Sequence, residues 1–167
     1  SIEDLRKVYS IGKSQVLIDQ DGVGGGVVSR GGYEGFHGGG PAAKEPDSGI
    51  KENYKMLKTQ CYYRFSEKVN SRVVQLQVNN ENVVIDGIIG CKIMTGSKVS
   101  DIRDLIKADL RAIKKLKPDS EGRKMINSKE EQKILLNGRS PDFGDTLMMR
   151  EWFELYDTQP FKIKRMN

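Results

Sequence analysis

The chain has 167 residues, which is enough for one ordinary domain with a single hydrophobic core. Hydrophobic residues make up 37% of the chain and charged residues 31%, and this composition excludes a chain that is disordered throughout. The net charge of +5 permits a polyanionic partner without requiring one.

Cysteine content and hydropathy exclude further classes of protein. The chain has only two cysteines, Cys61 and Cys91, and one histidine, which are too few for a zinc cluster and give no disulfide framework. No apolar run approaches the ~20 residues that span a bilayer, and the first ten residues are unlike a signal peptide. We therefore expect a soluble, intracellular chain with no membrane partner.

The first third of the chain predicts one helix and two short strands. Ile2, Leu5 and Val8 follow helical spacing, so residues 2–9 predict a short helix. The apolar run Gln15–Asp19 is typical of a buried strand. The glycine-rich residues 22–26 and 31–41 predict loop as far as Ile50, with one short strand near residues 34–37.

The middle of the chain predicts two longer helices separated by a β-rich stretch. The first helix has one apolar face, in which Cys61 is a small core residue: Tyr54, Leu57, Cys61, Phe65 and Val69. Val73–Val74 and Val83–Ile85 are strand candidates. An apolar stripe from Ile102 to Leu116 predicts the second helix, with Ser100 as its cap and Pro118 as its stop.

The last part of the chain predicts a strand and two helices. Residues 124–127 predict a short strand, and Ser128 with Glu131 forms a capping box for a helix that ends at residues 137–138, Asn-Gly. Ser140 as N-cap and Pro141 at the first helical position predict a final helix to about Tyr156. Together the elements predict a mixed α/β fold in a single domain, residues 1–167.

Asp19 is the first candidate site residue. It ends a predicted buried strand, Asp21 follows it, and a glycine turn comes next, which places the carboxylate at a sheet edge where ligands bind. A polar residue that merely ends a strand is an equally open interpretation. The glycine run resembles a nucleotide loop only weakly, because Val27 stands where a third glycine is needed and no Gly-Lys-Ser/Thr follows.

Asp142 and Asp145 form the second candidate site. They are three residues apart at the start of the last predicted helix and therefore share a face. Asp142 is an ordinary first-turn residue, because a helix N-terminus favours negative charge. Asp145 lies among apolar residues, and a half-buried carboxylate there needs a partner, for which a hard divalent cation is suitable.

Two carboxylate sites without a competing Ser, Cys or His arrangement favour metal-ion chemistry. Magnesium takes one or two protein carboxylates together with substrate phosphates, and two ions can hydrolyse a phosphodiester. His37, in a glycine-rich loop, is interpreted as incidental. Between Arg103 and Arg139, lysine and arginine outnumber aspartate and glutamate by 11 to 6, and the segment Lys114–Lys124 is either a solvated face or a phosphate contact.

Three stretches resemble the C-terminal nuclease domain of phage terminase large subunits. Residues 16–26, VLIDQDGVGGG, are similar to the family's acid-ending strand and Gly-x-Gly turn, and residues 52–69 are similar to its following helix. Residues 124–155 are the most specific, above all 139–150, RSPDFGDTLMMR, which resembles the family's Ser-Pro-Asp-x-x-Asp-Ala-Leu signature. Together these stretches cover most of the chain.

The resemblance implies a ribonuclease H-like mixed sheet flanked by helices, and an acid cluster that binds two Mg²⁺ or Mn²⁺ ions. By motif, Asp19 and Asp145 correspond to acids of that cluster, and Asp142 has a supporting role. The family cuts concatemeric double-stranded viral DNA in the bacterial cytoplasm, which implies phage or prophage origin. The implied partners are duplex DNA, the terminase ATPase domain, the small terminase subunit and the portal.

This sequence also departs from the family pattern. The family's first catalytic aspartate lies on an upstream strand, and no residue here corresponds to it, since Glu3 and Asp4 are in the wrong element. We therefore expect an N-terminally truncated domain that also lacks the ATPase domain. A non-catalytic module that docks DNA or the portal is the alternative function, and nucleotide binding is a third.

Overall fold

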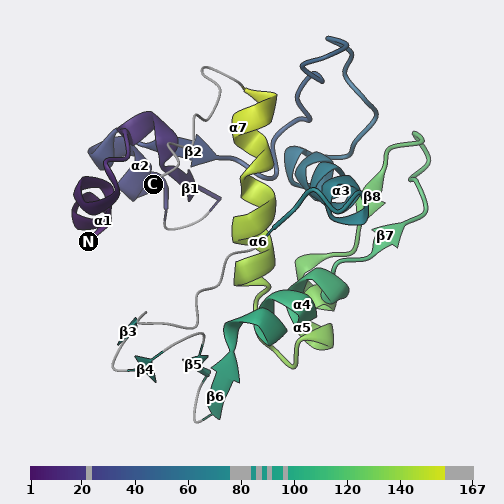
Figure 1. Ribbon diagram of the computed structural model, residues 1–167. Coiled ribbons are helices and arrows are strands. Elements are labelled where there is room, and N and C mark those ends of the chain that lie inside the picture. Colours follow the sequence, from purple (N-terminus) through teal and green to yellow (C-terminus); the bar gives the residue numbers. More distant parts are fainter. Residues whose placement is uncertain (22–23, 76–83, 86–87, 90–91, 96–97, 157–167) are drawn as a thin grey trace. The chain divides into compact units, whose positions relative to one another are not determined.

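The computed structural model describes residues 1–21, 24–75, 84–85, 88–89, 92–95 and 98–156 (Figure 1). The chain divides into two compact units, one formed by Ser1–Tyr62 with Met149–Asn167 and the other by Tyr63–Met148. Helices accompany small two-stranded sheets among the described residues of both units. The expected α/β class is confirmed, and the finer ribonuclease H-like arrangement stays a prediction.

The first unit is built around a parallel pair of short strands. Asp19, the last residue of β1, lies opposite Phe36, the last residue of β2, so both strands end at the same edge. The helix between them makes this a β-α-β unit, the arrangement that joins parallel strands. The unit contains α1 (Ile2–Tyr9), a 3-10 turn η1 (Lys13–Gln15), β1 (Leu17–Asp19), α2 (Gly25–Gly31), β2 (Glu34–Phe36), the start of α3 (Leu57–Asn70) and α7 (Glu151–Leu155).

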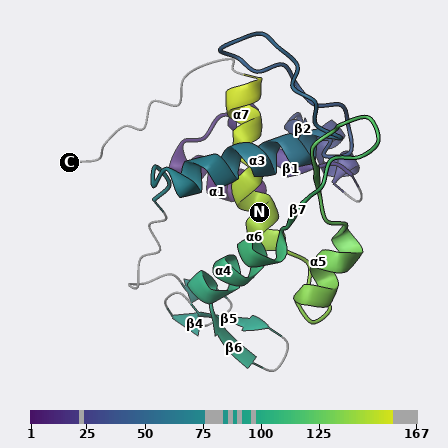
Figure 2. The ribbon, with the colours of Figure 1, turned by 90° about the vertical axis from the view of Figure 1, so that its right-hand side faces the viewer.

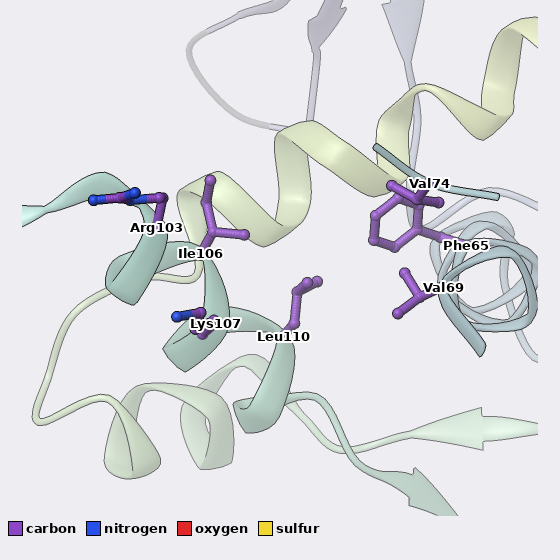
Figure 3. A pocket seen from close by; sticks show the side chains of 7 residues that line it. All are labelled: Phe65, Val69, Val74, Arg103, Ile106, Lys107 and Leu110. Atoms are coloured by element: carbon purple, nitrogen blue, oxygen red, sulfur yellow. The ribbon is translucent and has the colours of Figure 1, made fainter. Parts of the chain in front are cut away.

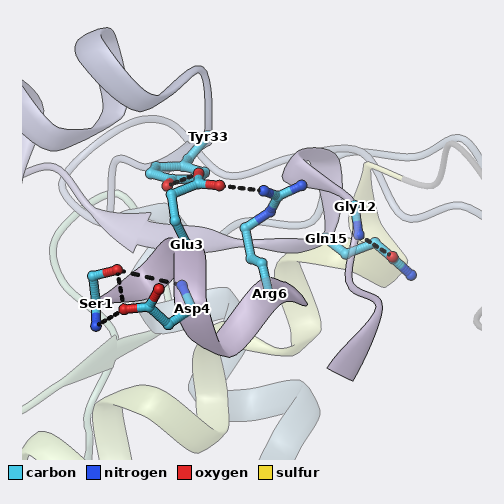
Figure 4. Close-up of polar contacts among 7 residues, drawn as sticks. All are labelled: Ser1, Glu3, Asp4, Arg6, Gly12, Gln15 and Tyr33. Atoms are coloured by element: carbon cyan, nitrogen blue, oxygen red, sulfur yellow. Dashed lines mark hydrogen bonds and ion pairs between the residues drawn. The ribbon is translucent and has the colours of Figure 1, made fainter. Parts of the chain in front are cut away.

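Helix α1 confirms the helix predicted over residues 2–9. Ser1 and Asp4 form a capping box at its start, and Ser10 ends it in the left-handed conformation, with φ 53°. Figure 4 shows that Glu3 accepts hydrogen bonds from Tyr33 and Arg6. Glu3 and Asp4 therefore have local structural partners at the start of the chain.

Helix α2 was not predicted, since its glycine content indicated loop. Gly24 comes so close to β1 that a Cβ there would overlap the carbonyl oxygen of Asp19, so the position requires glycine. Two side chains then bond back to carbonyls one turn earlier, Ser29 to Gly25 at 3.0 Å and Arg30 to Gly26 at 3.1 Å. The glycines therefore allow a close helix start, while the residues after them support the helix.

Cys61 is fully buried on α3, which confirms its predicted role as a core residue. The neighbouring Gln60 is buried as well, and its amide bonds to both main-chain groups of Ala43 and to the side chain of Glu45. These bonds hold the irregular chain before α3 against the helix. Helix α3 starts at Leu57, later than the predicted Tyr54, although Tyr54 is buried.

The second unit alternates small antiparallel strand pairs with helices. Figure 2 shows the β5–β6 hairpin beside the start of α4. The strands are β3 (Val84–Ile85), β4 (Ile88–Ile89), β5 (Lys92–Thr95), β6 (Lys98–Asp101), β7 (Lys115–Leu116) and β8 (Met125–Ile126). The helices after α3 are α4 (Ile102–Ala112), α5 (Lys129–Leu135) and α6 (Asp142–Met149).

The predicted end of α4 was wrong by one turn. The helix ends at Ala112, because the Asn127 side chain donates to the Ala112 carbonyl at 2.9 Å and accepts from the Lys114 amide at 2.8 Å. Lys115–Leu116 then pairs with Met125–Ile126, which confirms the strand predicted near residues 124–127. The N-cap is Asp101 rather than the predicted Ser100, since the Asp101 carboxylate accepts from the Arg103 amide.

The strand predicted at Val73–Val74 was also wrong. Arg72 has φ 59°, and the amides of Arg72 and Val73 donate to the carbonyls of Val69 and Lys68. These bonds cap the end of α3 and use the backbone that a strand would need. The other candidate, residues 83–85, is confirmed at Val84–Ile85, while Val83 lies outside the described residues.

The last helices follow the sequence signals in part. The capping box of Ser128 and Glu131 is present, and Asn137 and Gly138 have the positive φ values of a helix stop. The predicted final helix is divided at Arg150 into α6 and α7. Its N-terminal amides are capped from α4, by Asp109, where Ser140 was expected.

Candidate functional site

Asp19 stands at the carboxyl edge of the parallel strand pair in the first unit. It is exposed, and its carboxylate accepts a hydrogen bond from the Asp21 amide at 3.1 Å, which fixes the turn after β1. Because β1 and β2 end together, the residue after β2, His37, leaves the sheet at the same edge. Asp19 therefore occupies the edge position that its place in the sequence predicted.

Asp21 and His37 form a pair that the sequence analysis missed. Nδ1 of His37 bonds to one carboxylate oxygen of Asp21, and the Gly39 amide donates to the other oxygen at 2.9 Å. A Cβ at Gly38 would lie 3.3 Å from the Asp21 carboxylate and 2.8 Å from the Phe36 ring. The glycines after β2 thus leave room for the carboxylate. Parallel pairing of the two predicted strands was the signal that could have brought Asp21 and His37 together, because each residue follows the end of one of these strands.

Asp142 and Asp145 lie in the first turn of α6, in the second unit. Asp142 is exposed and Asp145 is half-buried, as expected. The Asp145 amide donates to the carbonyl of the buried Pro141 at 2.8 Å, which starts the helical hydrogen bonding. The structure therefore brings these two predicted site residues together, while Asp19 belongs to the other unit.

A third carboxylate, Asp109 of α4, meets the same helix start. It is 0% exposed, forms an ion pair with Arg139, and accepts from the amides of Phe143 at 3.0 Å and Gly144 at 3.1 Å. A helix N-terminus and an arginine together compensate a buried carboxylate. Asp109 therefore positions the turn that carries Asp142 and Asp145. Asp109 lies within the apolar stripe of α4, four residues after Leu105 and three after Ile106, and a carboxylate at such a position was the signal that could have found it.

The basic segment forms a hairpin, β7–β8, beside an aromatic ring. Nζ of Lys115 lies 4.4 Å from the centre of the Tyr63 ring and Nζ of Lys124 lies 5.9 Å from it, while the Tyr63 hydroxyl donates to the Met125 carbonyl. Arg123 pairs with Asp119, and the hydrogen bond from the Arg123 amide, with a smaller contribution from its side chain, lowers the pKa of the Asp119 carboxyl. Two lysines of this segment therefore lie beside one aromatic ring, while Arg123 is engaged with Asp119.

A cavity of about 340 Å³ lies between α3 and α4 in the second unit. Figure 3 shows apolar side chains of the two helices facing each other across it, with two cationic residues of α4 at one side. Those cations have acidic partners, Arg103 with Asp101 at 2.7 Å and Lys107 with Asp104 at 3.4 Å. It is lined by Phe65, Val69, Val74, Arg103, Ile106, Lys107 and Leu110. This lining offers no nucleophile and no carboxylate for metal-ion chemistry.

Within the described part of the chain, no three His, Cys, Asp or Glu side chains converge as a metal-binding group. A magnesium or manganese site does not need three, because one or two carboxylates with water and substrate phosphates suffice. Among the described residues, no helix is long and apolar enough to cross a bilayer. No protein-family model, curated protein or solved structure matches the chain.

Proposed function

We propose that this chain is a metal-dependent DNA endonuclease domain, the nuclease end of a phage-type DNA-packaging terminase large subunit. The proposal is based on one observation: carboxylates lie at the end of strand β1 and at the start of helix α6. Asp19 closes a parallel strand at a sheet edge, and Asp142 and Asp145 share the first turn of α6. The motif resemblance of residues 16–26 and 139–150 assigns the same acids to one cluster.

The donor chemistry fits the implied metal. Carboxylate oxygens are the ligands that Mg²⁺ and Mn²⁺ prefer, and two such ions would activate a water and stabilise the leaving oxygen of the phosphodiester. Asp19 and Asp145 would hold the ions, and Asp142 would assist. Asp109 has a different task, because its charge is already balanced by Arg139 and two main-chain amides.

Duplex DNA is the proposed substrate, cut without strong sequence preference. Lys115 and Lys124, held beside Tyr63, would contact phosphates, which fixes DNA position without reading bases. The ATPase domain, the small terminase subunit and the portal are the proposed protein partners. They rest on the family resemblance alone.

Plasmid nicking with Mn²⁺ or Mg²⁺ tests the proposal. We expect nicking by the purified chain, and its loss in Asp19→Asn and in Asp145→Asn. Asp47→Asn is the control, because it removes the same charge from an exposed position of the first unit. Unchanged nicking in Asp145→Asn would refute the site assignment.

A non-catalytic docking module remains the second candidate, favoured by the lysines of the β7–β8 hairpin. It predicts DNA binding without cutting, with an affinity that falls steeply as salt rises. Replacing Lys115 and Lys124 by alanine would then lower the slope of log affinity against log salt by about 2, since each phosphate contact contributes about 0.9. Metal-dependent nicking would exclude this module as the whole function.

A further inference from the structure

The single histidine of the chain, His37, is held by a hydrogen bond to Asp21 at the sheet edge where β1 and β2 end, the proposed metal-binding edge. His37 follows β2 directly and Asp21 lies two residues after the end of β1, and the two side chains bond through Nδ1 and a carboxylate oxygen. The second Asp21 oxygen accepts from the Gly39 amide at 2.9 Å, so the carboxylate is fixed from two directions. The pair therefore restrains the imidazole relative to the sheet edge.

Glycine at position 40 is needed for the ring to occupy this place. A Cβ there would lie 2.7 Å from Cδ2 of His37 and 3.1 Å from its carbonyl oxygen. The Gly40 amide also donates to that carbonyl at 3.0 Å, which closes a tight turn around the histidine. The ring's position thus depends on the local backbone as well as on Asp21.

The hydrogen bond to Asp21 determines which nitrogen is available to a ligand. Since Nδ1 donates its proton to the carboxylate, Nε2 of the neutral ring carries the lone pair. The His37 side chain is 61% exposed, so solvent and ions have access to the ring. A carboxylate behind one imidazole nitrogen, with the other nitrogen open, is the arrangement of a metal-ligating histidine and its orienting partner.

We propose that His37 is a metal ligand through Nε2, oriented by Asp21, and that it makes this edge prefer Mn²⁺ over Mg²⁺. This inference rests on the proposed function, because the ion would be the one that the proposed nuclease uses, and His37 follows β2 at the edge where β1 also ends. Imidazole is a common ligand of transition metals, whereas Mg²⁺ takes oxygen ligands and keeps its waters. Removing the imidazole should therefore weaken Mn²⁺ binding and spare Mg²⁺ binding.

Calorimetric titration of Mn²⁺ and Mg²⁺ into the full chain tests the proposal. We expect Mn²⁺ affinity to fall by at least about tenfold in His37→Ala and by about tenfold in Asp21→Asn, as for other ligand-orienting carboxylates. Mg²⁺ affinity should stay within about twofold in His37→Ala, and Asp47→Asn should change neither affinity. Unchanged Mn²⁺ affinity in His37→Ala, or an equal loss for both ions, would overturn the assignment.

A second measurement needs no substitution. Because the chain has one histidine, the imidazole signals are assigned to His37 without ambiguity. Nitrogen-15 NMR of the unligated chain at a pH where the ring is neutral should show the proton on Nδ1. A proton on Nε2 would overturn the proposal even if a variant failed to fold.

The outcomes separate this inference from the proposed function. Selective loss of Mn²⁺ binding in His37→Ala, without nicking by any variant, would support the histidine ligand and refute the nuclease. Mn²⁺-dependent nicking with unchanged Mn²⁺ affinity in His37→Ala would support the nuclease and refute the histidine ligand.

Discussion

Replacing Asp109 by alanine should destabilise the second unit more than other single changes on α4. The side chain is fully buried, and it is the acceptor for Arg139 and for the amides of Phe143 and Gly144. Alanine removes every one of these bonds at once. It leaves the Arg139 charge without its buried partner and leaves two amides at the start of α6 without their acceptor.

The size of the effect follows from the kinds of contact that are lost. Removing one partner of a buried ion pair costs about 3–5 kcal/mol, and loss of a helix cap alone costs about 1 kcal/mol. Because the cap and the ion pair share one carboxylate, the two costs overlap, and we expect about 4 kcal/mol in total. With a urea slope of about 2 kcal/mol per M, the unfolding midpoint should fall by about 2 M.

Urea unfolding followed by far-ultraviolet circular dichroism measures this change. Asp104→Ala is the matched control, since Asp104 is exposed on the same helix and has only a 3.4 Å ion pair with Lys107. The control should change stability by less than about 0.5 kcal/mol. The reasoning is refuted if Asp109→Ala costs less than about 1 kcal/mol, the scale of a cap alone. Adding Arg139→Met to Asp109→Ala should recover part of the loss, because it removes the unpaired charge.

Two further predictions concern other parts of the fold. Gly24→Ala should destabilise the chain by about 1–3 kcal/mol in urea unfolding, because its Cβ would overlap the Asp19 carbonyl oxygen, whereas Gly25→Ala has room and should not. The pKa of Asp101 is lowered to about 2, chiefly by hydrogen bonds from the side chain and amide of Arg103. The stability from this contact is therefore present above the unfolded carboxyl pKa of about 3.9 and lost as pH falls through about 2, and Asp101→Asn should abolish this part of the pH dependence. Carbon-13 NMR titration of the Asp101 carboxyl checks the pKa, and a value near 4 would contradict the contact.

The sequence predicted correctly those helix ends that are set by residues at the end itself. Ser128 and Glu131 begin α5 as a capping box, and the Asn-Gly pair after it has the expected positive φ values. The end of α4 was missed because its stop comes from Asn127, which lies 15 residues beyond the carbonyl that it bonds. An apolar stripe shows which face of a helix is buried, but it does not show where a distant side chain ends it.

The same contrast holds for the candidate site: features set by neighbouring residues were predicted, and contacts between distant segments were not. The positions of Asp19 at a strand end and of Asp142 and Asp145 at a helix start were predicted, because both kinds of element end are visible in the sequence. His37 was interpreted as incidental because its contact with Asp21 depends on the parallel pairing of β1 with β2, two segments separated by a helix. The apolar stripe of α4 places Asp109 on the buried face, but the sequence does not show that its partner is the start of α6, 34 residues away.

The capping by Asp109 changes how Asp142 and Asp145 are explained. A carboxylate in the first turn of a helix is ordinarily explained by the amides that it can compensate. At α6 the amides of Phe143 and Gly144 already bond to Asp109, whose charge is balanced by Arg139. The compensation that ordinarily explains a first-turn acid is therefore already supplied at these two amides by Asp109. The proposed metal role requires Asp145→Asn to lose nicking while circular dichroism shows that the variant stays folded, whereas loss of both the fold and nicking would assign Asp145 a structural role.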